Sequence, residues 1–370
     1  MATNHLHEIE ALGQAVWLDN ISRALIEDGE LQRLVDEDGI SGVTSNPTIF
    51  EKAMSGTDRY DEALRAAVND GLDEPREIFF RVGAADISDG CDILKPVYEK
   101  TEGLDGYVSF ELPPDVSDDV EGSVETAKRL REMVGRDNVL IKVPATEAGV
   151  AAFEELTAAG VSVNVTLLFA VPRYEAIAEA YVKGLERRHE AGEPIDRIAS
   201  VASFFVSRVD TKVDKALEGS DREQELRGKA GVANAKLAYE SFKRIFSGER
   251  WEKLAAAGAN VQRPLWASTG TKNPDYPDTL YVDNLIGPDT VNTMPDATLA
   301  AARDHANAGR TVDQGYDEAH KLIDDLREAG VPFDDIVGTE LLEEGLASFT
   351  KSFDSLMETI GEKARQATPA

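Results

Sequence analysis

The chain of 370 residues has little of what disulfide and metal chemistry require. It contains one cysteine, Cys91, and five histidines. One cysteine excludes an internal disulfide and a cysteine-based zinc site, so we expect Cys91 to be a small buried residue. No two histidines show metal-ligand spacing, which argues against a histidine metal site and against a Ser-His triad. We therefore expect neither a metal nor a cofactor.

Long hydrophobic runs and an excess of positive charge are also missing. No window approaches the roughly 20 apolar residues needed to cross a bilayer, and the first residues lack a signal-peptide pattern, so a cytoplasmic location is expected. The net charge of −30 argues against nucleic acid or an anionic membrane as a partner. Two interpretations of this charge stay open: adaptation to a salty cytoplasm, and an ordinary acidic enzyme. The dependence of stability on added KCl distinguishes them.

Eight short apolar runs have the length and the Val, Ile and Phe content of buried parallel strands. They span residues 15–20, 42–46, 106–112, 139–145, 161–169, 198–208, 263–270 and, more weakly, 282–294. Helix-period segments lie between most of them. This alternation predicts an α/β fold, a (β/α)8 TIM-type barrel with extra helices. An open doubly wound sheet is the alternative, but no G-x-G-x-x-G segment follows any of these runs.

We expect a single barrel domain over residues 1–370 with two additions. One is a helical insertion at about 209–260, read as two helices broken near Gly219 and Ser220. The other is a C-terminal helix at about 338–362, and residues 361–370 are expected to form a frayed tail. The C-terminal helix has an apolar stripe expected to face the core, with a partner-binding face as the alternative; the stripe consists of Leu342, Leu346, Phe349, Phe353, Leu356 and Ile360.

Most of the predicted strands carry polar side chains close to their C-terminal ends. In a barrel these ends converge on one face, where active sites are built. The candidates are Asp19, Asn46, Glu111, Lys142, Asn164, Thr166, Ser203, Arg208, Ser268 and Lys272.

Lys142 is unusual among them because apolar residues flank it on both sides in VLIKVPA. Lysine is rarely buried without a partner or a function. One interpretation is a snorkelling or ion-paired lysine at a strand end. The other is a nucleophile: burial favours the neutral amine, which can attack a ketone and form a Schiff base.

Schiff-base chemistry also requires groups that carry protons, and Glu111 and Asp19 are the carboxylates at strand ends. Taken singly, each is also explained as a helix N-cap or an ion-pair partner. Together with Lys142 they form a set with distinct acid and base roles.

Five motifs in this order extend the interpretation: GVTSNP, VLIKVPAT, VNVTLLF, SFFVSRVD and LWASTGTKNP. The chain resembles the transaldolase family in these motifs, especially its longer members, and also in GKAGVANAKLAY and DTVNTMP. The resemblance covers nearly the whole chain. It implies a class I aldolase-like barrel.

The resemblance also implies catalytic roles. Lys142 would be the Schiff-base lysine, and Glu111 would act on the carbinolamine through a water positioned by Thr166. Asp19 would take the proton from the hydroxyl whose loss cleaves the carbon-carbon bond.

For substrate binding, Asn46 and Asn164 resemble the donors to substrate hydroxyls, and Ser203 matches the residue near the ketol end. Phe205 lies two residues further along the same strand face and is expected to form an apolar wall that excludes water. Arg208, Ser268 and Lys272 resemble the family's anion pocket, where arginine can grip a phosphate bidentately. The alternative for Arg208 is an ion pair with Asp210 or a neighbouring carboxylate.

The implied reaction moves a dihydroxyacetone unit between sugar phosphates in the non-oxidative pentose phosphate pathway. Donors would be sedoheptulose 7-phosphate or fructose 6-phosphate, and acceptors would be glyceraldehyde 3-phosphate or erythrose 4-phosphate. The nearest rival is a fructose-6-phosphate aldolase that releases free dihydroxyacetone. A non-catalytic sugar-phosphate-binding barrel and a metal-dependent aldolase are more distant rivals, and the sequence leaves the oligomeric state open.

Overall fold

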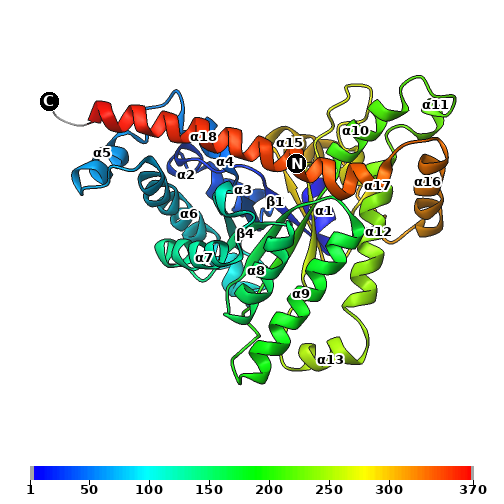
Figure 1. Cartoon of the computed structure of the whole chain (residues 1–370), viewed down its shortest axis with the longest axis horizontal. Helices are drawn as coiled ribbons and strands as arrows, with labels where there is room; N and C mark the ends of the chain where they lie inside the picture. The colour runs from blue at the N-terminus through cyan, green and yellow to red at the C-terminus, as the bar shows by residue number, and fades with distance from the viewer. Residues whose placement is uncertain (1–3, 368–370) are drawn as a thin grey trace.

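Eight parallel strands close into a barrel in sequential order, β1 to β8, in the computed structural model, which describes residues 4–367 (Figure 1). The (β/α)8 fold predicted from the sequence is therefore confirmed. The strands are β1 (Gln14–Leu18), β2 (Gly42–Thr44), β3 (Tyr107–Glu111), β4 (Val139–Pro144), β5 (Val163–Leu168), β6 (Ser200–Phe205), β7 (Arg263–Ala267) and β8 (Thr290–Met294).

Helices surround this barrel, and several begin at side-chain caps; Thr146, for example, accepts a hydrogen bond from the backbone of Gly149 at the start of α8. The helices are α1 (His5–Ala11), α2 (Arg23–Glu27), α3 (Glu30–Asp38), α4 (Pro47–Met54), α5 (Asp61–Asn69), α6 (Pro75–Lys100), α7 (Val120–Val134), α8 (Glu147–Ala158), α9 (Val171–Glu190), α10 (Ser207–Leu217), α11 (Glu223–Leu226), α12 (Ala230–Ile245), α13 (Gly248–Ala256), α14 (Leu280–Asn284), α15 (Asp296–His305), α16 (Tyr316–Glu328), α17 (Phe333–Asp335) and α18 (Leu341–Ala367). A 3₁₀ turn, η1 (Pro114–Val116), and a π-helical turn, η2 (Ile336–Glu340), complete the set. Between residues 4 and 367, no helix combines the length and the apolar character that a membrane span requires.

Three segments differ from the sequence-based expectation. The weak run at 282–294 begins inside α14, and only Thr290–Met294 forms a strand, because Gly287 and Pro288 separate the two apolar pieces. In the region 209–260, α10 ends at Leu217 near the predicted break, but three helices follow it rather than one. Finally, α18 continues to Ala367, so most of the expected tail is helical, and residues 368–370 lie outside the described part of the chain.

The barrel interior is divided into an apolar layer and a polar layer. Six buried side chains of alternating strand positions pack in one cluster and fill the N-terminal part, namely Trp17, Tyr107, Leu140, Val201, Leu265 and Val291. Gly42 makes room for Trp17, since a Cβ at Gly42 would lie 2.3 Å from the indole ring. Because strand side chains alternate, Lys142 points to the same side as Leu140 and belongs to the next layer toward the C-terminal ends.

Helix α18 runs along one end of the molecule, past α4, α5 and α6 (Figure 1). It also contacts the end of β5, where a Cβ at Gly345 would come within 2.8 Å of Leu167. The apolar stripe predicted for this helix faces inward, since Phe349, Phe353, Leu356 and Ile360 are buried. The helix therefore covers part of the C-terminal end of the barrel.

Candidate active site

Three predicted residues lie side by side on neighbouring strands. In the register of β3, β4 and β5, Glu111 is paired with Lys142, and Lys142 with Asn164. The Lys142 Nζ donates to Glu111 Oε2 at 3.1 Å and to the carbonyl of Ser45 at 2.9 Å. The parallel pairing thus brings together an amine, a carboxyl group and an amide that are far apart in the sequence.

The Lys142–Glu111 pair is shielded from water. Its side chains are 5% and 6% exposed, so Lys142 is ion-paired but does not snorkel to the surface. Burial raises the pKa of Glu111, although the neighbouring Lys142 ammonium partly offsets this shift. A carboxyl group with a raised pKa readily holds a proton, and Glu111 is therefore placed to exchange one with the amine.

Asp19 directly follows β1 and is held by a chain of hydroxyl groups. Its Oδ1 accepts a hydrogen bond of 2.6 Å from Thr44 Oγ1, which lies 2.7 Å from Thr293 Oγ1. Burial raises the pKa of Asp19, and the charge of Lys142 opposes this effect. Asp19 neither caps a helix nor forms an ion pair within residues 4–367, so neither structural explanation for it applies.

Thr166 has a buried hydroxyl group for which residues 4–367 provide no hydrogen-bond partner. The pairing of β5 with β6 is irregular between Val165 and Leu168, and Leu167 has a φ of 60°. A positive φ is unfavourable for a leucine, and bulges of this kind re-aim side chains next to active sites. An unsatisfied buried hydroxyl at such a point is free to bind a water or a substrate atom.

Asn164 and Ser203 form a connected polar pair across β5 and β6. Ser203 Oγ donates to Asn164 Oδ1 at 2.7 Å, and Asn164 Nδ2 donates to Ser109 Oγ at 3.1 Å. Asn46 has a second role that sequence reasoning missed: its Oδ1 caps α4 by accepting from Ile49 N at 3.0 Å. This cap fixes the side chain while its amide hydrogens remain available.

A cavity of about 570 Å³ opens beside Asp19 and Asn46, which follow β1 and β2. The predicted side chains on β3 to β6 are not among its lining residues. The cavity brings together four predicted site residues with side chains from α4, α15 and α18. Its lining consists of Asp19, Asn20, Ser22, Asn46, Thr48, Ile49, Lys52, Ala53, Arg208, Lys272, Pro295, Asp296, Ser348 and Phe349.

Arg208 lines this cavity without an anionic partner. No residue in the described part of the chain forms a hydrogen bond or an ion pair with its guanidinium, which lies 5.1 Å from the centre of the Phe205 ring. Asp210, the alternative partner, instead accepts hydrogen bonds from Gly231 N at 2.7 Å and from the Tyr281 hydroxyl at 2.9 Å. Burial lowers the pKa of Arg208, yet a guanidinium remains charged at neutral pH. The half-buried cation is therefore available to an anionic ligand.

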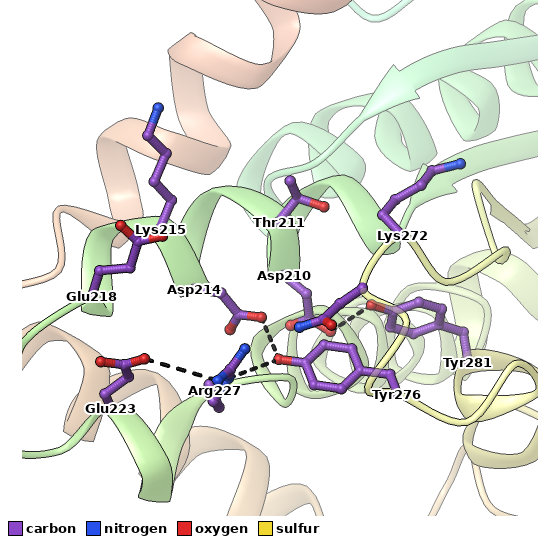
Figure 2. Close-up of a pocket in the computed structure, with 11 residues that line it drawn as sticks. Asp210, Thr211, Asp214, Lys215, Glu218, Glu223, Arg227, Lys272, Tyr276 and Tyr281 are labelled. Atoms are coloured by element: carbon purple, nitrogen blue, oxygen red, sulfur yellow. Dashed lines mark hydrogen bonds and ion pairs between the residues drawn. The ribbon is translucent and has the colours of Figure 1, made fainter.

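Lys272 lies between this cavity and a second one of about 350 Å³ beside α10 and α11. Figure 2 shows the side chain of Lys272 pointing away from the Tyr276 cluster, where Tyr276 bonds to Asp214 and Arg227. These bonds anchor the loop that carries Lys272 to α10, the helix that also carries Arg208. Ser268 has a φ of 55°, and its hydroxyl lies 2.8 Å from Ser207 Oγ, so that hydroxyl already has a protein partner.

Several residues of the site were not singled out from the sequence. The carbonyl of Ser45 accepts from Lys142, and the hydroxyl groups of Thr44 and Thr293 form the chain that leads to Asp19. Thr44 and Thr293 meet there because β2 and β8 flank β1 in the closed barrel. The only signal for Thr44 and Ser45 was their place in the GVTSNP motif. Within residues 4–367, no group of three or more His, Cys, Asp or Glu side chains is arranged to hold a metal ion, and Cys91 is buried in α6.

Comparisons with known proteins agree along the whole chain. Residues 16–360 match the family described as Transaldolase/Fructose-6-phosphate aldolase. The chain is 46% identical to Transaldolase 2 from Nostoc sp. (strain PCC 7120) and 44% identical to a transaldolase from Trichodesmium erythraeum, in each case over 100% of both chains. It is 49% identical to a transaldolase from Parafrankia sp. over 98% of both chains. The chain therefore belongs to the transaldolase/fructose-6-phosphate aldolase family.

Proposed function

We propose that this protein is a transaldolase that carries a dihydroxyacetone unit as a Schiff base on Lys142. Transaldolase activity follows from the full-length identity of 44 to 49% with curated transaldolases. The assignment of roles to residues is our own inference. The observation that carries it is the buried amine of Lys142, 3.1 Å from a carboxyl group, at the active face of a closed barrel.

The first half-reaction begins at the Lys142–Glu111 pair. Proton transfer from the ammonium to Glu111 leaves a neutral amine, which attacks the ketone and forms a carbinolamine. Protonated Glu111 then supplies the proton that lets the hydroxyl group leave as water, directly or through a water bound at Thr166. The product is a protonated imine, which withdraws electrons from the neighbouring carbon-carbon bond.

Asp19 completes the cleavage. Its carboxylate takes the proton from the sugar hydroxyl next to the scissile bond, the bond electrons move into the imine, and an aldehyde leaves. The enamine that remains on Lys142 then attacks an acceptor aldehyde, whose new hydroxyl group receives the proton from Asp19. Hydrolysis of the imine with the help of Glu111 releases the new ketose, so the enzyme returns to its starting state.

Polar and charged side chains at the cavity and on the barrel strands suit a sugar phosphate as the substrate. The amides of Asn46 and Asn164 and the hydroxyl of Ser203 offer uncharged groups to the sugar hydroxyls. Arg208 and Lys272 offer positive charge to the phosphate, with Ser268 as a further hydroxyl group near by. We propose fructose 6-phosphate or sedoheptulose 7-phosphate as donors, and erythrose 4-phosphate or glyceraldehyde 3-phosphate as acceptors.

Transfer is favoured over release of free dihydroxyacetone, because the full-length relatives described above are transaldolases. Phe205 contributes physically to this difference. Its buried ring packs against Phe169 with centroids 5.3 Å apart and lies beneath Arg208. An apolar wall at this point keeps water from protonating the enamine before the acceptor arrives.

Borohydride trapping with fructose 6-phosphate, followed by peptide mapping, tests the proposal. We expect one reduced adduct, on Lys142, and none in the Lys142→Ala variant. Lys100→Ala is a matched control, since Lys100 is an exposed lysine at the end of α6 that precedes β3. An adduct on any other residue, or no adduct in the wild type, would overturn the assignment. Free dihydroxyacetone measured with and without an acceptor separates transfer from release.

A further inference from the structure

One cation at the cavity has no role in the reaction described above. Lys52 lies in the last turn of α4 and lines the same cavity as Asp19 and Arg208. The helix turns one face to this cavity, since Thr48, Ile49 and Lys52 are spaced three and four residues apart and all line it. The side chain of Lys52 is therefore directed by its helix toward the site.

Lys52 is exposed, and no residue between 4 and 367 engages its amine in a hydrogen bond or an ion pair. The adjacent carboxylate, Glu51, accepts instead from Ser355 Oγ on α18 at 2.6 Å. Asp296, an acidic group of the cavity, accepts from Asn20 Nδ2 at 2.9 Å. The charge of Lys52 is thus left for a ligand.

The position of Lys52 complements that of the two predicted phosphate-binding cations. Helix α4 follows β2, and the helix carrying Arg208 follows β6, which lies four strands away in the eight-membered ring. Lys52 therefore faces the cavity from the side opposite Arg208. The charged groups that line the cavity are Lys52, Arg208 and Lys272 with Asp19 and Asp296. The balance is positive, although the chain as a whole carries −30.

We propose that Lys52 is a substrate-binding residue that attracts and holds the phosphate group of the incoming sugar at the cavity mouth. This inference rests on the proposed function and adds a binding residue to it. A protein of strong negative charge repels an anionic substrate at long range, and a local cation at the mouth counters that repulsion. Lys52 touches neither the amine nor the carbon that reacts, so its effect is on binding.

The test compares Lys52→Gln with the wild type at low ionic strength. We expect the KM for glyceraldehyde 3-phosphate to rise about two- to fivefold, as is usual for an exposed ion pair, with kcat unchanged. The KM for unphosphorylated glyceraldehyde should not change. The difference should shrink as salt rises toward 1 M, where charges are screened beyond about 3 Å. Lys100→Gln, with the same change of charge, should behave like the wild type.

An unchanged KM for the phosphorylated acceptor would overturn the role of Lys52, and so would an equal rise for both acceptors. Binding of inorganic phosphate to the wild type and to Lys52→Gln provides a measurement that needs no turnover. Weaker phosphate binding in the variant, with no transfer by the wild type, would refute the proposed function but support the role of Lys52. Equal phosphate binding by the two proteins, with normal transfer by the wild type, would support the proposed function and refute the role of Lys52.

Discussion

The two ends of the barrel each contain a buried ion pair, and their surroundings differ. At the N-terminal end, Arg263 opens β7 and Asp105 lies just before β3, with a closest approach of 3.4 Å. The carboxylate of Asp105 also accepts hydrogen bonds from Trp17 Nε1 at 2.8 Å and from Ser41 Oγ at 2.9 Å. The guanidinium donates in addition to the carbonyl of Leu104 at 2.9 Å. This pair is surrounded by partners.

At the C-terminal end, the Lys142–Glu111 pair is at least as buried but has fewer partners. The Glu111 carboxylate receives only the Lys142 amine within residues 4–367. In the same range, the hydroxyl of Thr166 has no hydrogen-bond partner, and the guanidinium of Arg208 contacts the Phe205 ring but has no hydrogen-bond or ion-pair partner. Arg208 lines a cavity together with Asp19 and Asn46. Their remaining hydrogen-bonding capacity is available to a ligand.

The surroundings of the two pairs distinguish a structural ion pair from a reactive one. Both pairs are buried, so burial alone does not separate them. Satisfaction of every donor and acceptor indicates a structural role, because an unsatisfied buried polar group costs stability. Unsatisfied groups beside a cavity, with a carboxyl pKa raised by burial, indicate chemistry.

The largest effect is expected from Glu111→Gln. Glutamine preserves the size of the side chain but cannot exchange a proton, so Schiff-base formation should slow by about 10² to 10⁴. Stopped-flow mixing with fructose 6-phosphate followed by borohydride quenching measures this rate. The adduct should still map to Lys142. Formation at the wild-type rate would remove Glu111 from the mechanism.

A large loss of stability, without a loss of intrinsic activity, is expected from Arg263→Met at the opposite end. Methionine keeps much of the apolar volume but leaves the Asp105 carboxylate buried without its cation. Breaking a buried pair in this way costs about 3 to 5 kcal/mol, to be measured by urea unfolding. The kcat per folded molecule should remain at the wild-type level. A variant as stable as the wild type would show that the hydrogen bonds of Asp105 suffice without Arg263.

The barrel and the bounds of most of its strands could be predicted from the sequence. Val, Ile and Phe in runs of strand length marked β3, β4 and β5 to within two residues at each end, because strands buried on both faces leave a continuous apolar signal. The convergence of Glu111 and Lys142 follows from parallel pairing of consecutive strands. The eighth strand was placed too early because Val282 in α14, with Leu285 and Ile286 just after it, gives a segment as apolar as the strand itself.

Contacts between segments that are far apart in the sequence could not be predicted from it. The pairing of Asp105 with Arg263 joins residues 158 positions apart, and neither has a local pattern that marks it. The same holds for Lys52, whose orientation depends on how α4 packs against α18. Asn-Pro before a helix is a familiar N-terminal signal, so the cap made by Asn46 could have been predicted. It was missed because the residue was assigned to binding alone. Local periodicity therefore predicts elements, while the partners of individual polar groups depend on tertiary packing.

A smaller change in stability, which depends on pH, is expected from Asp19→Asn. Burial raises the pKa of Asp19 above its ordinary value of 3.8. Between that value and the raised one, the folded protein keeps a proton that the unfolded chain has released. The contribution of Asp19 to the unfolding free energy therefore becomes unfavourable as pH rises through this window and is fully unfavourable above it. Asparagine can still accept the hydrogen bond from Thr44 and carries no charge to bury.

We therefore expect Asp19→Asn to be inactive but more stable than the wild type at pH 8, by on the order of 1 kcal/mol, as often results when an active site loses its function. The gain should shrink as pH falls through this window and disappear only well below 3.8, where the aspartate is protonated in both states. Urea midpoints across this range measure the difference. Asp105→Asn is the control at the other end: it should lose stability at pH 8, because its carboxylate is paired with Arg263. A loss of stability in both variants would mean that Asp19 is a structural group like Asp105, and the distinction between the two ends would fail.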